Sequence, residues 1–166
     1  MSNSKEWERL TADQKSLINK HQAQCPVRLG GIANELGIQV KLATLPANIS
    51  GEIKEVNGAV TIRINQHDVK ARQRYTLAHE IAHFLLHRHL LGEGITDDVL
   101  YRSAQSNEIE AEANRLAADI VMPMCQIDEF YKQHYKGKKD SILYETIATE
   151  LGVSTIALKY RLGVNT

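Results

Sequence analysis

The sequence has no excess of charge of either sign, since 20 lysine and arginine residues balance 20 aspartate and glutamate residues. A net charge of zero gives no electrostatic reason to expect binding to nucleic acid or to an anionic membrane surface. The sequence also lacks an apolar run of transmembrane length, and residues 1–7 contain no apolar segment of a secretion signal. We therefore expect a soluble, cytoplasmic protein.

Cysteine is scarce as well. Cys25 and Cys125 lie far apart in the sequence and form no C-x-x-C pair, which favours buried free thiols in a reducing compartment. Hydrophobic residues make up 43% of the 166 residues. This is enough for the core of one domain, or of one domain with a small appendage.

The order of patterns along the chain predicts an α+β fold. Residues 4–24 are typical of an amphipathic helix that ends before Pro26, and a second short helix ends at Gly37. The apolar residues then recur with a period of two, and Asn57-Gly58 favours a type I′ hairpin turn. Strands are predicted at 38–42, 51–56 and 59–64. This small three-stranded sheet has one apolar face, which we expect the next helix, at about 69–89, to cover.

The second half of the chain is predicted to be mostly helical. Residues 92–105 are predicted to be irregular, with Asp97 and Asp98 in a loop. Helices are expected at 106–122 and 124–135, followed by a helical pair from 141 to 162. The domain organisation we predict is an N-terminal helix within 1–25, a main domain at 26–135, and a C-terminal helix-turn-helix-like pair within 141–166 packed on the same domain.

The most informative stretch is His79-Glu80-Ile81-Ala82-His83. On an α-helix, residues four apart lie on one face about one turn apart, so both imidazoles can reach a single metal ion. Glu80 follows His79 by about 100° of rotation, which puts its carboxylate beside the ligands and within reach of a metal-activated water. The pattern predicts a zinc-dependent peptidase with His79 and His83 as metal ligands and Glu80 as the catalytic residue.

The alternative is an ordinary amphipathic helix whose histidines lie at a polar border. The polar strip of this helix is mostly imidazole, whereas a solvated strip more often carries Lys, Arg, Gln or Glu. The polar strip of this helix consists of Thr76, His79, Glu80, His83 and His87. Apolar residues elsewhere around the helix indicate burial, which favours the metal site.

A peptidase zinc site usually takes three protein ligands and leaves one position for water. The helix at 106–122 offers the acids Glu108, Glu110, Glu112 and Asp119. Glu110 falls within the apolar arc of that helix and the other three on its solvent side. A buried carboxylate is costly unless it is paired or binds a metal, so we select Glu110 as the third ligand. Asn114, one turn further on, is placed to orient a ligand. The alternative is that Glu110 lies at a helix border and meets an arginine.

His87 continues the histidine strip and competes with Glu110. Three histidines at successive turns would extend over about 12 Å of helix axis, too far to close on one ion without bending the helix. We therefore expect His87 to support the site without binding the metal, and His89 to be exposed at the helix end.

Several blocks of the sequence, in order, resemble the ImmA/IrrE family of metallopeptidases. They are residues 32–38, 50–53, 72–83, 110–118 and 121–123. The resemblance covers about residues 26–130 and implies a zincin-like fold, with Zn²⁺ bound by His79, His83 and Glu110 and Glu80 as the catalytic acid/base. It also implies a substrate class, namely DNA-binding repressors of the helix-turn-helix type, often encoded beside the peptidase.

Peptide hydrolysis at this site needs a group that transfers protons and a group that stabilises the oxyanion. Glu80 would accept a proton from water and pass it to the leaving amine, and an oxyanion stabiliser is needed as well. The candidates for this stabiliser are Tyr101, Arg102, His134 and Tyr144. Extended substrate could add to a free edge of the sheet.

Residues 147–158 have helix-turn-helix spacing, with Gly152 in the turn. The second helix of this pair carries only two basic residues, Lys159 and Arg161, and contacts to DNA phosphates usually need more. A packing module, or a surface that meets the repressor, is therefore favoured over DNA binding. Two alternatives to a peptidase stay open: a metal-binding partner of a repressor or antitoxin that does not cleave it, and a DNA-binding regulator that uses the C-terminal pair.

Overall fold

The computed structural model of the chain describes residues 2–98 and 107–164. It has the α+β fold that the sequence predicts. One cluster of buried apolar side chains contains Trp7 from the N-terminal segment, Ile81 from the predicted metal helix and Ile147 from the C-terminal pair. None of the helices in the described stretches combines the length and the hydrophobicity that are needed to cross a bilayer.

The N-terminal segment forms two short helices, so the single helix expected over residues 4–24 is wrong. The 3₁₀-helix η1 spans Trp7–Arg9 and helix α1 spans Ala12–His21. The chain is interrupted between them because Thr11 caps α1. The Thr11 hydroxyl accepts a hydrogen bond from the Gln14 backbone N–H, and the Gln14 side chain accepts one from the Thr11 N–H.

Helix α2 (Leu29–Glu35) leads into a sheet with four strands among the described residues. The strands are β1 (Ile38–Ala43), β2 (Ile49–Val56), β3 (Ala59–Asn65) and β4 (Ile95–Asp98), in the order β1-β3-β2-β4. β1 pairs with β3 in parallel, and β2 pairs antiparallel with both β3 and β4. The hairpin turn is confirmed, because Asn57 and Gly58 have φ angles of 52° and 80°.

The fourth strand corrects the sequence prediction. Asp97 and Asp98 belong to β4, which pairs with β2, so the loop expected there is wrong. Four residues are too few to establish a period of two, and the strand forms through its pairing with β2, which is remote in sequence. The edges of the described sheet are therefore β1 and β4.

Helix α3 (Lys70–Leu86) lies against β2 and β3 and covers the sheet as predicted. The close approach depends on Gly51 in β2. A Cβ at Gly51 would lie 2.5 Å from Thr76 Cγ2 and 3.1 Å from the Arg63 carbonyl oxygen. Any side chain at this position would therefore push the strand and the helix apart.

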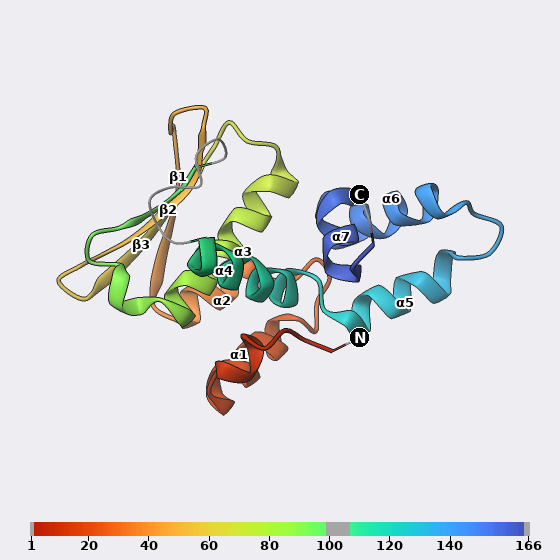
Figure 1. Cartoon of the computed structure of the whole chain (residues 1–166), viewed down its shortest axis with the longest axis horizontal. Coiled ribbons are helices and arrows are strands. Elements are labelled where there is room, and N and C mark those ends of the chain that lie inside the picture. Colours follow the sequence, from red (N-terminus) through yellow and green to blue (C-terminus); the bar gives the residue numbers. More distant parts are fainter. Residues whose placement is uncertain (1, 99–106, 165–166) are drawn as a thin grey trace.

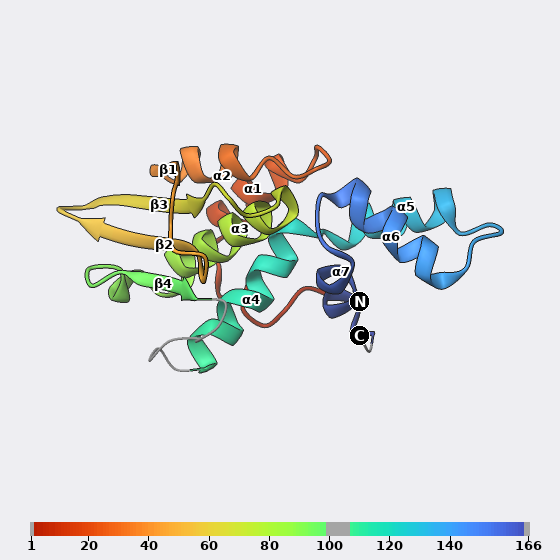
Figure 2. The ribbon, with the colours of Figure 1, turned by 90° about the horizontal axis from the view of Figure 1, so that it is seen from above.

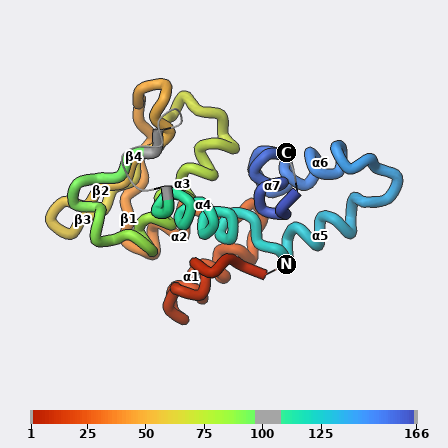
Figure 3. The backbone as a smooth tube through the Cα atoms, in the orientation of Figure 1, coloured from red at the N-terminus to blue at the C-terminus, as the bar shows by residue number. Residues whose placement is uncertain are grey.

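The remaining helices pack around and beyond α3. They are η2 (Arg88–Leu90), α4 (Asn107–Val121), α5 (Met124–His134), α6 (Asp140–Leu151) and α7 (Thr155–Leu162). Figure 1 shows the sheet at one end of the molecule and α5–α7 at the other, with α3 and α4 between them. Figure 2, from above, shows α3 and α4 together beside the sheet. The tube in Figure 3 shows that the N-terminal segment runs from below α7, beneath α4, to α1.

Two ion pairs attach remote segments to α4. Arg161 of α7 pairs with Asp119 at 3.0 Å, and the N-terminal Glu6 pairs with Arg115 at 2.6 Å. Both carboxylates are buried. The expectation that Asp119 faces solvent is wrong, because α7 and Ser4 cover that side of α4. The Ser4 backbone N–H and hydroxyl both donate hydrogen bonds to the Asp119 carboxylate.

The cysteines also differ from expectation. Cys25 and Cys125 are free, but both are exposed. Cys25 lies in the connection before Pro26, and Cys125 in the first turn of α5 on the side away from the core.

Candidate metal centre

His79 and His83 lie one turn apart on the buried side of α3, with 3% and 0% of their surface exposed. Their Nε2 atoms are 3.1 Å apart, and the two rings meet edge to face. A helix with histidines at a solvated border is therefore excluded. The helical spacing has placed two imidazole nitrogens at one buried point.

Glu110 brings a carboxylate from α4 to the same point. Its Oε2 lies 3.0 Å from His79 Nε2, and its Oε1 lies 3.2 Å from His83 Nε2. Glu110 is 5% exposed, and it meets two histidines where the alternative predicted an arginine. Each of the three side chains offers one ligand atom, and these atoms lie within 4.8 Å of one another.

The charge state of Glu110 suits a ligand. Burial would raise the pKa of its carboxyl, but hydrogen bonds from His79 and His83 outweigh burial and hold the pKa well below its usual range. Glu110 is therefore ionised at neutral pH, as a metal ligand must be.

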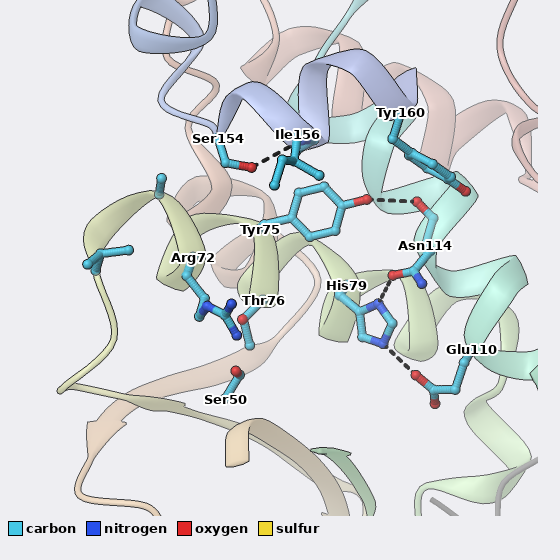
Figure 4. A pocket seen from close by; sticks show the side chains of 13 residues that line it. Ser50, Arg72, Tyr75, Thr76, His79, Glu110, Asn114, Ser154, Ile156 and Tyr160 are labelled. Atoms are coloured by element: carbon cyan, nitrogen blue, oxygen red, sulfur yellow. Dashed lines mark hydrogen bonds and ion pairs between the residues drawn. The ribbon is translucent and has the colours of Figure 1, made fainter. Parts of the chain in front are cut away.

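Asn114 orients His79, as the sequence predicts. Its Oδ1 lies 2.9 Å from His79 Nδ1 (Figure 4). A doubly protonated His79 donates Nε2–H to Glu110 and Nδ1–H to Asn114. In the neutral ring, the proton that stays on Nδ1, facing Asn114, leaves a lone pair on Nε2, facing Glu110. Two acceptors that face each other need a cation between them, and two imidazoles with one carboxylate are the donor set of a peptidase zinc site. The three side chains thus fit a zinc ion.

His87 supports His83 from the other side. The Nδ1 atoms of the two rings are 2.9 Å apart, so one of them carries the proton and the other accepts it. Burial and the charge of His83 lower the pKa of His87 to about 4, so a neutral His87 can accept. A proton on His83 Nδ1 puts the lone pair of the neutral ring on Nε2, the nitrogen that faces His79 and Glu110 and would bind a metal. The second nitrogen of His87 lies 3.8 Å from Glu112 Oε1.

Glu80 directly follows His79 on α3 and is fully buried. The role of Glu80 as the catalytic residue stays a prediction from the motif. His89, in contrast, is exposed as expected.

Comparison with known proteins agrees with this geometry. The family model of the IrrE N-terminal-like domain, of the peptidase family M78, matches residues 33–163. The chain belongs to the ImmA/IrrE family.

This ImmA/IrrE protein was also compared with curated proteins and with solved structures. No curated protein matches its sequence. A solved structure described as a Mycobacterium tuberculosis transcriptional regulator shares the fold, with a TM-score of 0.61 at 13% identity. The match covers 94% of this chain and 48% of the regulator, so the chain spans about half the length of that protein.

A pocket of about 650 Å³ opens beside the metal centre of this ImmA/IrrE protein. Figure 4 shows His79 and Glu110 at one end of it. Arg72 and Thr76 of α3 lie on one side with Ser50 of β2. Ile156 and Tyr160 of α7 lie on the other side with Ser154, the residue that caps α7.

Apart from His79, Glu110 and Asn114, the sequence did not identify the residues that line this pocket. A signal was present on α3, because Arg72, Thr76 and His79 recur at intervals of four and three residues and so share a face. No such signal was available for α7, which meets α3 only through the fold.

Two of the four candidate oxyanion stabilisers lie within the described residues. Tyr101 and Arg102 lie outside the described residues. His134 pairs with Glu150, and Tyr144 lies beneath Lys159. Neither of these two lines the pocket, so neither is placed to contact a substrate at the metal centre.

Proposed function

We propose that this protein is a cytoplasmic zinc-dependent endopeptidase that cleaves a regulatory protein, specifically a helix-turn-helix repressor. The observation that supports this most directly is the buried convergence of His79, His83 and Glu110. Zinc binds such a set readily and keeps a position open for water. The repressor as substrate rests on family membership.

The residues of the chain would divide the chemistry among them. His79, His83 and Glu110 would hold zinc, which supplies Lewis acidity to a water molecule and to the peptide carbonyl. Glu80 would take a proton from that water and deliver it to the leaving amine. Asn114 and His87 would keep the two imidazoles in the tautomers that present Nε2 to the metal.

One observation argues against DNA binding through the C-terminal pair. Arg161 is buried in its ion pair with Asp119, and Lys159 lies over the ring of Tyr144, 5.8 Å from its centroid. The two basic residues of α7 are thus engaged within the protein, which leaves α7 little charge for phosphate contacts.

The test uses Glu80→Gln, with Glu108→Gln as a matched control because Glu108 is an exposed acid on α4. Each zinc-loaded protein is incubated with purified helix-turn-helix repressors from the same genome, and fragments are identified by mass spectrometry. We expect wild type and Glu108→Gln to cleave one of these repressors, and Glu80→Gln to bind zinc and that repressor without cleavage. Equal cleavage by Glu80→Gln would refute the proposed mechanism. Repressor binding without cleavage by any of the three proteins would favour the non-proteolytic alternative.

A further inference from the structure

The pocket beside the metal centre has a polar and an apolar side. Three large apolar side chains that line it are strongly exposed: Ile156 at 69% and Tyr160 at 49% on the apolar side formed by α7, and Val69 at 72% at the start of α3. Ile156 and Tyr160 lie four residues apart and so share a face of α7. Exposed apolar side chains that line a concave surface are typical of a binding site. Because His79 and Glu110 line the same pocket, its occupant lies next to the metal centre.

Arg72 gives the pocket a positive charge. It is exposed and lines the polar side (Figure 4). Among the described residues, no carboxylate forms an ion pair with it, and the acid that shares the pocket, Glu110, is engaged with the two histidines. An arginine in this situation is suited to a carboxylate from the ligand, through two parallel hydrogen bonds.

The spacing of Arg72 and His79 along α3 indicates how far that carboxylate would lie from the metal ligands. Arg72 precedes His79 by seven residues, which is about 10 Å along the axis of α3. An extended peptide covers about 3.3 Å per residue, so this distance corresponds to about three residues. The pocket continues past Arg72 to Val69 at the start of α3. A peptide therefore has room to continue beyond Arg72, which favours an internal segment over a chain end.

We propose that this pocket is a substrate subsite that α7 completes. It would bind an internal segment with an apolar residue beside the scissile bond, held by Ile156 and Tyr160, and an acidic residue about three positions away, held by Arg72. This inference rests on the proposed peptidase function. It assigns the C-terminal pair to substrate selection instead of DNA reading.

The proposed role of the Arg72 charge is tested with pools of random decapeptides, whose cleavage products are sequenced by mass spectrometry. One pool has blocked termini and the other has a free carboxyl terminus. Wild type, Arg72→Gln and Arg72→Glu are compared with Lys70→Gln, which removes a cation from the same helix outside the pocket. We expect wild type and Lys70→Gln to prefer Asp or Glu about three positions from the cut in both pools.

Arg72→Gln should lower cleavage of those acidic peptides about tenfold and spare neutral ones, as expected for a hydrogen-bonded charge. Arg72→Glu should exchange the acidic preference for a basic one, which a purely structural role of Arg72 could not produce. An acidic preference that survives both substitutions overturns the proposal. Cleavage confined to peptides with a free carboxyl terminus overturns it as well, since it would assign Arg72 to chain ends.

The apolar side is tested in the same pools with Ile156→Asp. Its control is Ile142→Asp, because Ile142 is a half-exposed residue of the same helical pair that does not line the pocket. We expect Ile156→Asp alone to lose the preference for an apolar residue beside the cut. Equal profiles for the two variants would show that α7 does not contact the substrate.

A wild-type protein that binds zinc and cleaves neither pool would refute the peptidase function without deciding the subsite. Binding then decides it, measured by fluorescence anisotropy with a labelled decapeptide that carries an apolar residue and a Glu three positions apart. Arg72-dependent binding that is lost with a Gln analogue supports the subsite. Binding unaffected by Arg72→Gln, or no binding, overturns it.

Discussion

Arg74 of α3 packs directly against Gly152, in the turn between α6 and α7. A Cβ on Gly152 would lie 2.8 Å from Arg74 Nε and 3.2 Å from its Cδ. The same guanidinium donates a hydrogen bond to the Val27 carbonyl at 3.0 Å. Helix α3, the C-terminal pair and the chain before α2 therefore meet at one side chain, which helps to hold α7 beside the pocket.

This contact predicts unequal effects of two glycine substitutions. Gly152 and Gly137 have the same φ of +71°, but an added Cβ at Gly137 meets no atom within 4 Å. Gly137→Ala should cost about 1 kcal/mol from the left-handed backbone alone. Gly152→Ala should cost a further 1–3 kcal/mol or so, because the methyl group displaces a hydrogen-bonded arginine. Urea unfolding followed by circular dichroism measures both, and equal losses would contradict the contact.

Removing one partner of the Asp119–Arg161 ion pair should lower the free energy of unfolding more than removing one partner of a surface ion pair. The Arg161 side chain is 6% exposed, and it also donates to the Met122 carbonyl at 3.0 Å. Arg161→Ala leaves a buried carboxylate without its cation, which should lower the free energy of unfolding by about 3–5 kcal/mol. Arg63→Ala, which removes the exposed partner of Glu52, should cost less than about 1 kcal/mol. Similar losses in denaturant unfolding would mean that the first pair is not desolvated.

The sequence predicted which side chains converge, because each of them has a local signal. The spacing of His79 and His83 fixes one helix face, and the place of Glu110 in an apolar arc identifies a carboxylate that needs a partner. Helix–helix packing then brings the two helices together, as the distances of 3.0 and 3.2 Å between Glu110 and the histidines show. Asn114 was found for the same reason, one turn beyond Glu110.

The remaining features depend on contacts between segments that are remote in sequence. β4 is too short to show a period and forms by pairing with β2. Asp119 has the pattern of a solvent-facing acid, and it is buried only because Arg161 and Ser4 reach it. The wall that α7 gives the pocket likewise arises when the C-terminal pair docks on α3 and α4. No local pattern of residues indicates such contacts.

Glu6 predicts a pH dependence of stability. Burial would raise the pKa of its carboxyl, but hydrogen bonds and charge from Arg115 outweigh burial and lower the pKa below the ordinary value of 4.5. Such a group stabilises the fold above its unfolded-state pKa, and this contribution is lost as pH falls through the folded-state pKa. The difference in unfolding free energy between wild type and Glu6→Gln should therefore be larger at pH 7 than at pH 3.

The control for this prediction is Glu8→Gln. Glu8 carries the same charge two residues further on, but its side chain is 74% exposed and pairs with Lys15 at the surface. The loss on Glu8→Gln should be small at both pH values. A loss on Glu6→Gln that does not change with pH would mean that Arg115 does not stabilise the ionised carboxylate.

His87 predicts an effect on metal affinity without being a ligand. Its Nδ1 faces His83 Nδ1 at 2.9 Å, so it can hold the proton of His83 on that side and leave Nε2 for zinc. His87→Ala should weaken zinc binding about 10- to 100-fold, which is the usual effect of removing a group that orients a ligand. His89→Ala, the exposed neighbour, should leave the affinity unchanged. Competition with a chromophoric chelator at fixed pH measures both, and equal affinities for the two variants would show that His83 is oriented without His87.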